Sequence, residues 1–313
     1  MKNLRFGILL LLLFILLATA LPIVGANLYR RFLHKDEPET VSVYFHENNE
    51  YKSLHRDEYL LGVTLNVIDR KYSEETLNAA VIALRSACYY LKGACREGCG
   101  ADADYCTCKF SLSYCDNEEY LQKHGGDGQK YIDSILHAIE ETKGKYLLYE
   151  NSYALALVHR SSYMTTQSAY EALGREYPYL ESVITPEKAE IFENYVLDID
   201  LKRKLALYLN TAHSEDISPS LTLSRTGRVS SVSLYSCEIS SEIFMDIFDL
   251  RSDFFEIEEA YGGIVIRTYG VGHGLGLSLA GAEKMVENGF YCTDVLSYYF
   301  RGCKIIDENE SKI

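Results

Sequence analysis

The sequence predicts an α+β fold, with a single mixed domain after one N-terminal transmembrane helix. Three observations predict it. Helical stretches with one apolar face alternate irregularly with short strand-like segments, no internal repeat or low-complexity linker divides the chain, and a long uncharged run precedes the first strand. About 280 residues follow that run, which is enough for one large domain or two small ones.

The uncharged run extends from Phe6 to Ala26 and contains 21 residues, of which leucine is the commonest. At 1.5 Å per residue it reaches roughly the 30 Å of a bilayer core, which predicts an uncleaved membrane anchor. A cleaved signal peptide is the alternative, because Ala18–Ala20 offers small residues at a cleavage site. We expect residues 1–35 to form a cytoplasmic tip, the anchor and a juxtamembrane segment, and residues 36–313 to form the extracytoplasmic domain.

The first half of the chain predicts one strand and three helices. Val41–Phe45 alternates in polarity, which is typical of a strand, and Asp57–Val63 begins a short helix. Ser73–Leu91 has a serine at the N-cap position, two glutamates in its first turn and apolar residues at helical spacing. Gln129–Thr142 repeats that spacing, and Gly144 follows it as a stop signal.

The second half mixes strands and helices. Lys145–Tyr149 and Tyr153–His159 predict a hairpin. A Thr-Pro pair at residues 185–186 predicts the start of a helical stretch that continues to about residue 210. Short strands follow, with one helix from Ser240 and another after Gly276.

The charge balance limits the partners of the chain. The formal net charge is −14, from 31 basic and 45 acidic residues, which disfavours nucleic acid and other anionic polymers. Tyrosine is abundant, with 26 residues, and tryptophan is absent. Tyrosine rings combine an apolar face with a polar tip and can stack on sugar rings, so a polysaccharide partner remains open.

Glycine occupies four alternate positions in Gly270–Gly276, with His273 in the middle. Glycine adopts positive φ and leaves the backbone bare, so a ligand or a closely packed loop is one explanation. The other is a tight turn between a strand and a helix, with His273 satisfied locally. The spacing excludes a dinucleotide fingerprint, because the third glycine is Gly274 rather than the next residue, and a second βαβ half does not follow.

Five of the nine cysteines fall between residues 95 and 115, in a polar insert rich in Gly, Asp, Ala and Thr. Closely spaced thiolates can bind a tetrahedral zinc ion. Outside the cytoplasm the same cysteines would form disulfides, and both alternatives stay open. A redox or metal-sensing module is a third class of function for this insert. The candidate zinc ligands are Cys95, Cys99, Cys106 and Cys108.

Several separated segments carry a family resemblance. In chain order they are Glu58-Tyr59, Gly62-Val63, Arg85, Tyr153–Ser162, Thr226–Val229, Phe248–Phe254, Gly272–Ser278, Gly281-Ala282 and Tyr298–Gly302. Together they resemble the motifs of the stage II sporulation protein D family, whose relatives include the amidase-enhancer proteins. The resemblance covers about Val41 to Ile306, and blocks in this order are far more specific than any single one.

The resemblance implies a function in remodelling the cell wall. Family members are membrane-anchored proteins that bind peptidoglycan and cleave its glycan strands as lytic transglycosylases during forespore engulfment, alongside an amidase and a membrane protein. It implies a single-pass protein of the cell membrane, whose domain faces outside or the intermembrane space. The implied glycan-binding residues are His159, Ser161, Ser162, Gly272, His273, Gly274 and Ser278.

The resemblance also implies a catalytic glutamate five positions after Gly62, where this chain has Val67. Cleavage requires a carboxylic acid that protonates the glycosidic oxygen while the 6-hydroxyl of the sugar attacks the anomeric carbon. Valine cannot donate this proton, and Asp69 would face the opposite side of a continuing helix. We therefore expect a peptidoglycan-binding protein with impaired catalysis. The alternative is an active enzyme with a displaced acid from Asp69, Glu171 or the cysteine-rich insert.

Overall fold

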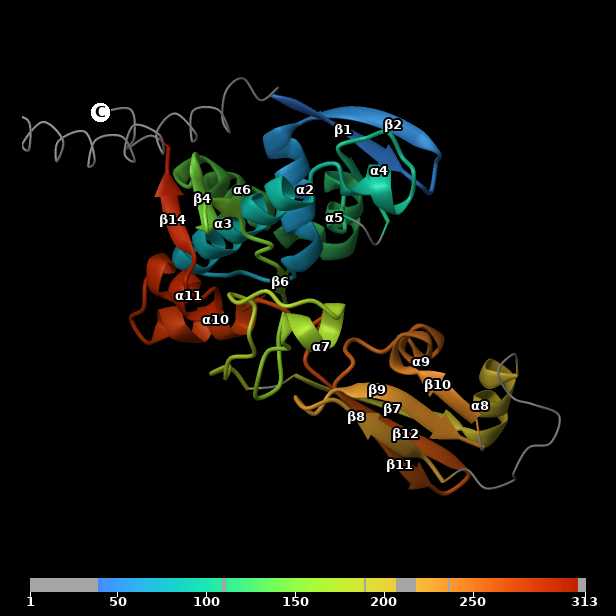
Figure 1. Cartoon of the computed structure of the whole chain (residues 1–313). Helices are drawn as coiled ribbons and strands as arrows, with labels where there is room; N and C mark the ends of the chain where they lie inside the picture. Colours follow the sequence, from blue (N-terminus) through green and yellow to red (C-terminus); the bar gives the residue numbers. More distant parts are fainter. Residues whose placement is uncertain (1–38, 109–110, 189, 207–217, 236, 309–313) are drawn as a thin grey trace, which may run out of the picture. The chain divides into compact units, whose positions relative to one another are not determined.

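The structure is a computed structural model that describes residues 39–108, 111–188, 190–206, 218–235 and 237–308. Helices and strands are interspersed along these residues, so the predicted α+β class is confirmed (Figure 1). None of the helices in these ranges is both long and apolar enough to cross a bilayer. The expected anchor, Phe6–Ala26, lies outside the described residues. Ser42 onward forms one compact unit.

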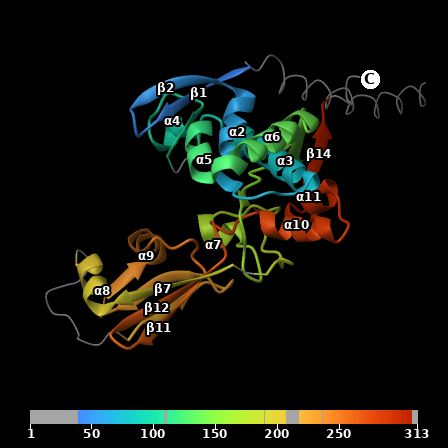
Figure 2. The same cartoon turned by 180° about the vertical axis from the view of Figure 1, so that it is seen from behind.

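Helix α3 (Glu74–Leu91) lies at the centre of the helical part and packs against α2 (Arg56–Val67), α6 (Gly128–Glu141) and α11 (Cys292–Tyr299) (Figure 2). Every residue from 79 to 88 of α3 is buried, because neighbours cover the helix on more than one side. Each fully buried leucine in this core contributes about 1.5–3 kcal/mol relative to an exposed one. The three predicted helices of the first half are thus confirmed, and α2 is longer than predicted.

Two polar residues, one at the start of α3 and one within it, make hydrogen bonds to other parts of the protein. Ser73 is the N-cap residue, as predicted, but its hydroxyl makes no capping hydrogen bond and instead donates to Glu283 Oε2 at 2.8 Å. Arg85 is buried and donates to the carbonyls of Ile139 and Thr142 at 2.9 and 2.6 Å. The guanidinium thus satisfies carbonyls at the end of α6 that have no partner within the helix.

A small sheet lies at the start of the unit, in the order β2-β1-β3. Its strands are β1 (Thr40–Phe45), β2 (Glu50–His55) and β3 (Tyr105–Cys106). The pairing of β1 with β3 is parallel, with Tyr44 opposite Cys106. It joins the first strand to the cysteine-rich insert, which also contains α4 (Ala94–Gly98) and is followed by α5 (Asn117–His124) and the 3₁₀ turn η1 (Gly125–Asp127).

The predicted hairpin is confirmed only in its first arm and turn. Strand β4 (Lys145–Tyr149) pairs with β5 (Ser152–Tyr153) and with β14 (Lys304–Asp307). The second arm does not continue to His159. Instead, β6 (Val158–His159) pairs in parallel with β13 (Leu277–Ser278), which links the second and last motif blocks.

The remaining elements lie between and after these strands. They are α7 (Ala169–Leu173), β7 (Ile191–Leu197), α8 (Asp198–Leu205), β8 (Ser220–Leu223), β9 (Val229–Leu234), β10 (Cys237–Ser240), α9 (Ser241–Phe248), β11 (Phe255–Ala260), β12 (Gly263–Tyr269) and α10 (Leu279–Glu287). The helices predicted from Ser240 and after Gly276 are α9 and α10, and serines cap both of them.

Two three-stranded sheets, β10-β9-β8 and β11-β12-β7, share an apolar core with α8 and α9. Here the prediction of one helical stretch from residue 185 to about 210 is wrong. Residues 191–197 form strand β7, which is antiparallel to β12 with Leu197 opposite Gly263. The helix begins only at Asp198. Buried residues of β9, α9 and β12, among them Val232, Phe244 and Ile264, fill the core.

Candidate functional site

A cavity of about 520 Å³ is lined by segments that are distant in the sequence. Helix α2 contributes Val67, β6 contributes His159, and the loop before β13 contributes Gly272 and His273. Arg251, which follows α9, lines it as well. We term it the Val67 cavity. It gathers residues from the first, second and last motif blocks.

Backbone pairing fixes the two segments that carry the histidines. Ser161 and Val271 exchange both backbone hydrogen bonds, at 3.1 and 2.9 Å, beside the β6–β13 pairing. Gly276 has a φ of 71°, and a Cβ there would lie 2.2 Å from the carbonyl oxygen of Leu157. Only glycine fits this close approach, so the bare backbone serves loop packing at this position.

His159 is 1% exposed, and both its ring nitrogens have partners. Nδ1 lies 3.1 Å from the carbonyl oxygen of Leu275, and Nε2 lies 2.6 Å from Ser162 Oγ. Because a carbonyl only accepts, Nδ1 carries the proton and the Ser162 hydroxyl donates to Nε2. Burial lowers the pKa of His159 well below its usual value, and the nearby charges of His273 and Arg228 act in the same direction.

His273 faces the cavity and keeps access to solvent there. Its Nδ1 accepts a hydrogen bond of 3.1 Å from the backbone N–H of Leu275, and its ring centroid lies 5.6 Å from that of His159. Packing of the ring in the cavity wall removes part of its hydration and lowers the pKa of His273, and the positive charge of Arg228 acts in the same direction. Both imidazoles are therefore neutral near pH 7.

The seven predicted glycan-binding residues divide into two groups. His159, Gly272 and His273 line the cavity. Ser161, Ser162 and Ser278 are buried behind it, and Gly274 packs against Arg228, whose Nη2 would lie 2.0 Å from a Cβ there. These four support the wall without lining it.

Glu187 connects the second and last motif blocks, a role that the sequence reasoning missed. Its Oε1 accepts from the backbone N–H of Ser162 at 2.9 Å and from Ser278 Oγ at 2.6 Å. Its position next to a Thr-Pro pair, interpreted as a helix start, gave no signal for such a long-range contact. The carboxylate holds the two segments together.

The chain is similar in sequence to known proteins. Residues 44–149 match the family described as stage II sporulation protein. The chain is 27% identical over 279 residues to stage II sporulation protein D of Bacillus amyloliquefaciens, covering 87% of this chain and 80% of the relative. This chain is a divergent member of the stage II sporulation protein D family.

Two further relatives of this family member are more distant. Stage II sporulation protein D of Bacillus subtilis (strain 168) is 25% identical over 280 residues, which is 87% of this chain and 80% of the relative. An uncharacterized protein of Brachyspira hyodysenteriae is 25% identical over 264 residues, which is 82% of this chain and 68% of the relative.

Among the described residues, no Asp or Glu side chain lines the Val67 cavity of this family member. Helix α2 ends at Val67, and Ile68 is extended, so the chain has left the helix before Asp69. Asp69 Oδ2 lies 3.8 Å from Nη1 of Arg160, and Asp69 Oδ1 accepts from the Tyr72 hydroxyl at 3.4 Å. Asp69 is thus outside the cavity lining, although its partner Arg160 belongs to that lining.

Glu171, the other candidate acid, lines a different cavity of about 680 Å³. There it accepts from Thr226 Oγ1 at 2.7 Å and lies 3.6 Å from Nε of Arg225. In the described part of the insert, the carboxylates of Asp102 and Asp104 also have partners of their own, at Arg96 and Ser42. None of these carboxylates lines the Val67 cavity.

The cysteine-rich insert forms a second site, the histidine–cysteine cluster of His46, Cys99, Cys106 and Cys108. One ligand atom from each lies within 4.8 Å of the others. The sulfur atoms of Cys99 and Cys106 are 3.8 Å apart, which fits the roughly 3.7 Å expected for two thiolates on one tetrahedral zinc ion, whereas those of Cys106 and Cys108 are closer, at 3.0 Å. One imidazole and three thiols are a donor set that zinc accepts.

Three of these four donors were predicted from the sequence, and His46 was missed. The parallel pairing of β1 with β3 places Tyr44 opposite Cys106, and the backbone N–H of His46 donates to Thr107 Oγ1 at 3.0 Å. The fourth predicted ligand, Cys95, is buried, and its sulfur lies 2.6 Å from that of Cys106. Cys106 is thus shared between the cluster and Cys95.

Proposed function

We propose that this protein binds the glycan strands of the cell wall in the Val67 cavity and cleaves them poorly or not at all. It would act during sporulation as a membrane-anchored scaffold, with its domain outside the membrane, alongside the amidase and membrane protein of the engulfment machinery. One observation carries the proposal. The described lining of the cavity keeps His159, His273 and Arg251, but it contains no carboxylate, and Val67 stands at the expected position of the acid.

The histidines do not replace that acid. A general acid must hold its proton at the working pH and release it in the transition state. The pKa of His273 lies below its usual value, so the ring is mostly neutral at pH 7 and holds no proton to donate as an imidazolium. His159 has its pKa lowered as well, and its ring nitrogens are both engaged. The proposed site is therefore suited to binding rather than to bond cleavage.

The test is digestion of purified glycan strands, with and without stem peptides, by the full chain. Mass spectrometry would detect the 1,6-anhydro ends that a lytic transglycosylase forms, and co-sedimentation would report binding. We expect the wild type to bind without forming anhydro ends, and Val67→Glu to form them. Val67→Gln is the matched control, because it adds a similar volume without an acid.

Anhydro products from the wild type would overturn the proposal and favour a displaced acid. In that case Asp69→Asn and Glu171→Gln would identify which carboxylate supplies the proton. A wild type that fails to sediment with either kind of strand would contradict the binding function itself.

We further infer that the histidine–cysteine cluster binds one structural zinc ion. A bound metal would tie the first strand to the insert through His46 and three sulfur atoms. The full chain, purified under reducing conditions, should contain about one zinc per molecule by elemental analysis. His46→Ala should lose metal affinity, whereas His55→Ala, in the adjacent strand β2, should retain it. Metal-free protein with a disulfide between Cys95 and Cys106 would support the disulfide alternative instead.

A further inference from the structure

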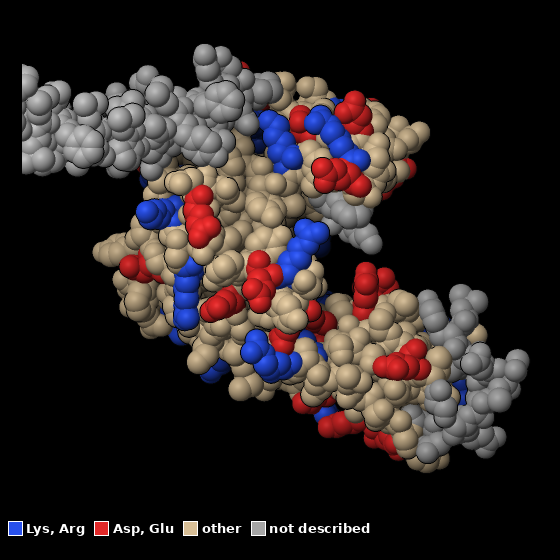
Figure 3. All heavy atoms as spheres, in the orientation of Figure 1, with Lys and Arg blue, Asp and Glu red and all other residues tan. Residues whose placement is uncertain are grey.

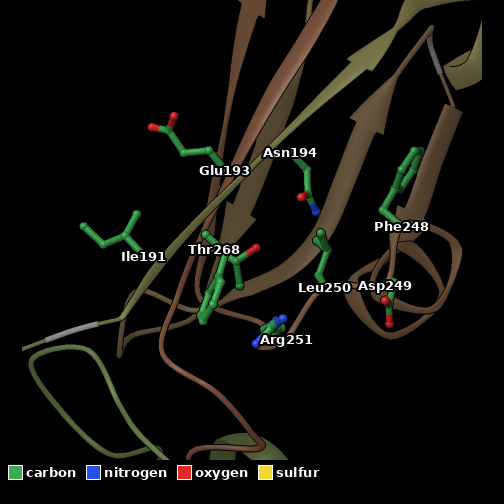
Figure 4. A pocket seen from close by; sticks show the side chains of 9 residues that line it. Ile191, Glu193, Asn194, Phe248, Asp249, Leu250, Arg251 and Thr268 are labelled. Atoms are coloured by element: carbon green, nitrogen blue, oxygen red, sulfur yellow. The ribbon is translucent and has the colours of Figure 1, made fainter.

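A second cavity, of about 380 Å³, shares Arg251 with the Val67 cavity. Strand β7 supplies one side of it and the end of α9 another, with Thr268 of β12 in the lining (Figure 4). We term it the Phe192 cavity. The proposed function does not use it, although Arg251 lines both cavities.

Arg251 is held by contacts that leave its hydrogen-bond donors free. Its guanidinium carbon lies 4.1 Å from the centroid of the Phe192 ring, in a cation–π contact that uses the flat face. Its carbonyl oxygen accepts from the backbone N–H of Gly272 at 2.8 Å, which ties it to the glycine loop. Asp249 ends α9 with a φ of 51° and turns the chain toward this position. The N–H groups along the guanidinium edge remain available to a ligand.

The neighbouring arginines are engaged elsewhere. Arg160 lies 3.8 Å from Asp69, Arg228 is paired with Asp253, and Arg267 is 2.6 Å from Glu193. No carboxylate of the described residues forms an ion pair with Arg251. Arg251 is therefore an uncompensated cation at the point that both cavities share.

The charges around Arg251 confine the attraction of an anion to the guanidinium. Acidic and basic side chains are interspersed over the face shown in Figure 3, and the whole chain carries a net charge of −14. The two histidines of the Val67 cavity are neutral near pH 7. In the Phe192 cavity, Glu193 shares Arg267 with Glu258, and Asp249 is exposed without contacting Arg251. An anion is attracted to the guanidinium rather than to the protein as a whole.

We propose that the Phe192 cavity is a further saccharide subsite, in which Arg251 binds a carboxylate carried by the glycan. This inference rests on the proposed function. In peptidoglycan every second sugar bears a lactyl ether, whose carboxylate is free wherever no stem peptide is attached. A planar guanidinium binds a carboxylate through two parallel hydrogen bonds. The exposed side chain of Asn194 in the same lining offers partners for sugar hydroxyl groups.

The test uses the full chain in detergent and isothermal titration calorimetry with two glycan fragments. One fragment carries free lactyl carboxylates, and the other has the same carboxylates converted to methylamides. Arg251→Gln should weaken binding of the free-carboxylate fragment roughly ten- to a hundredfold and leave the methylamide fragment nearly unchanged. Arg251→Lys should restore part of the loss, because it keeps the charge without the fork. Arg203→Gln, at an exposed arginine of α8, is the control.

The outcomes separate this inference from the function on which it rests. Failure of the wild type to bind either fragment would overturn both. Equal binding of both fragments, unchanged in Arg251→Gln, would leave glycan binding in place and overturn the role of Arg251. That role would also be overturned if Arg251→Gln weakened both fragments equally, or if the wild type preferred a phosphodiester polymer to the carboxylate fragment. Thermal melting shows whether each variant is folded. If Arg251→Gln does not fold, the comparison of Arg251→Lys with the wild type tests the role of Arg251.

Discussion

The Val67 cavity and the histidine–cysteine cluster are assembled from the sequence in different ways. Three of the four cluster donors lie between residues 99 and 108, and one strand pairing supplies the fourth. The cavity wall instead joins segments from Val67 to His273 through loop backbone and long-range hydrogen bonds. A wall built from so many segments survives the loss of a single functional side chain. A metal site with four donors does not tolerate such a loss, because each donor is one ligand of the metal.

The substitution with the largest expected effect would disrupt the Val67 cavity and leave the cluster donors in place. Gly276→Ala forces a Cβ to within 2.2 Å of the Leu157 carbonyl oxygen in a left-handed backbone conformation. We expect the free energy of unfolding in urea to fall by about 3–5 kcal/mol. Gly289→Ala is the control, because Gly289 also has a positive φ but nothing lies within 4 Å. That control should cost about 1–2 kcal/mol, and equal losses at both sites would contradict the packing argument.

Removal of zinc tests the other region. If the cluster binds zinc at about a hundred times its Kd, chelation should lower the free energy of unfolding by about 3 kcal/mol. Glycan affinity should change little, since among the described residues of the insert only 111–113 line the cavity. Urea unfolding and strand binding, each measured with and without chelator, separate the two effects. A large loss of glycan affinity would show instead that the cluster shapes the cavity.

The buried histidine gives the cavity a dependence on pH. The unfolded chain binds a proton at His159 below a pKa of about 6.5, whereas the native state does not because burial lowers the pKa of His159. Stability is therefore present above that value and is lost as the pH falls. From pH 7 to pH 5 this histidine alone should reduce the free energy of unfolding by about 2 kcal/mol.

The matching measurement is urea unfolding at pH 5, 6 and 7. His159→Gln should flatten the pH dependence by that amount, and His137→Gln, at an exposed histidine of α6, should leave it in place. The same slope in wild type and His159→Gln would show that His159 is not the group responsible.

The smallest expected effect concerns Asp69, which lies next to the cavity wall but not in it. Asp69→Asn removes a partly exposed pair with Arg160 and should cost less than about 1 kcal/mol. In a Val67→Glu background it should leave the formation of anhydro ends unchanged, because the introduced glutamate would supply the proton. A loss of activity in the double variant would place Asp69 in the chemistry after all.

The sequence predicted the helices whose buried face is visible in the spacing of apolar residues within one segment. Helices α3 and α6 have continuous apolar spacing and clear ends, and they form where expected. Strand β7 was predicted as a helix because the Thr-Pro pair suggested a helix start. Its pairing partner, β12, lies more than sixty residues later, beyond the reach of any local pattern.

The same limit applies to the two sites. The spacing of the cysteines predicted Cys99, Cys106 and Cys108, but His46 joins them only through the β1–β3 pairing. The residues that line the Val67 cavity were identified by motif rather than by contact. Motif likeness does not distinguish His159, in the lining, from Ser162, which donates to it from behind.

The alternating glycines of the loop have a consequence for how this site can change over generations. Gly270, Gly272, Gly274 and Gly276 all have positive φ, so a side chain at any of these four positions meets backbone strain. Of the three residues between them, Leu275 is 3% exposed, and the backbone of Val271 pairs with Ser161. Inherited variation in what this loop offers to a ligand is therefore concentrated at two codons, those of Val271 and His273.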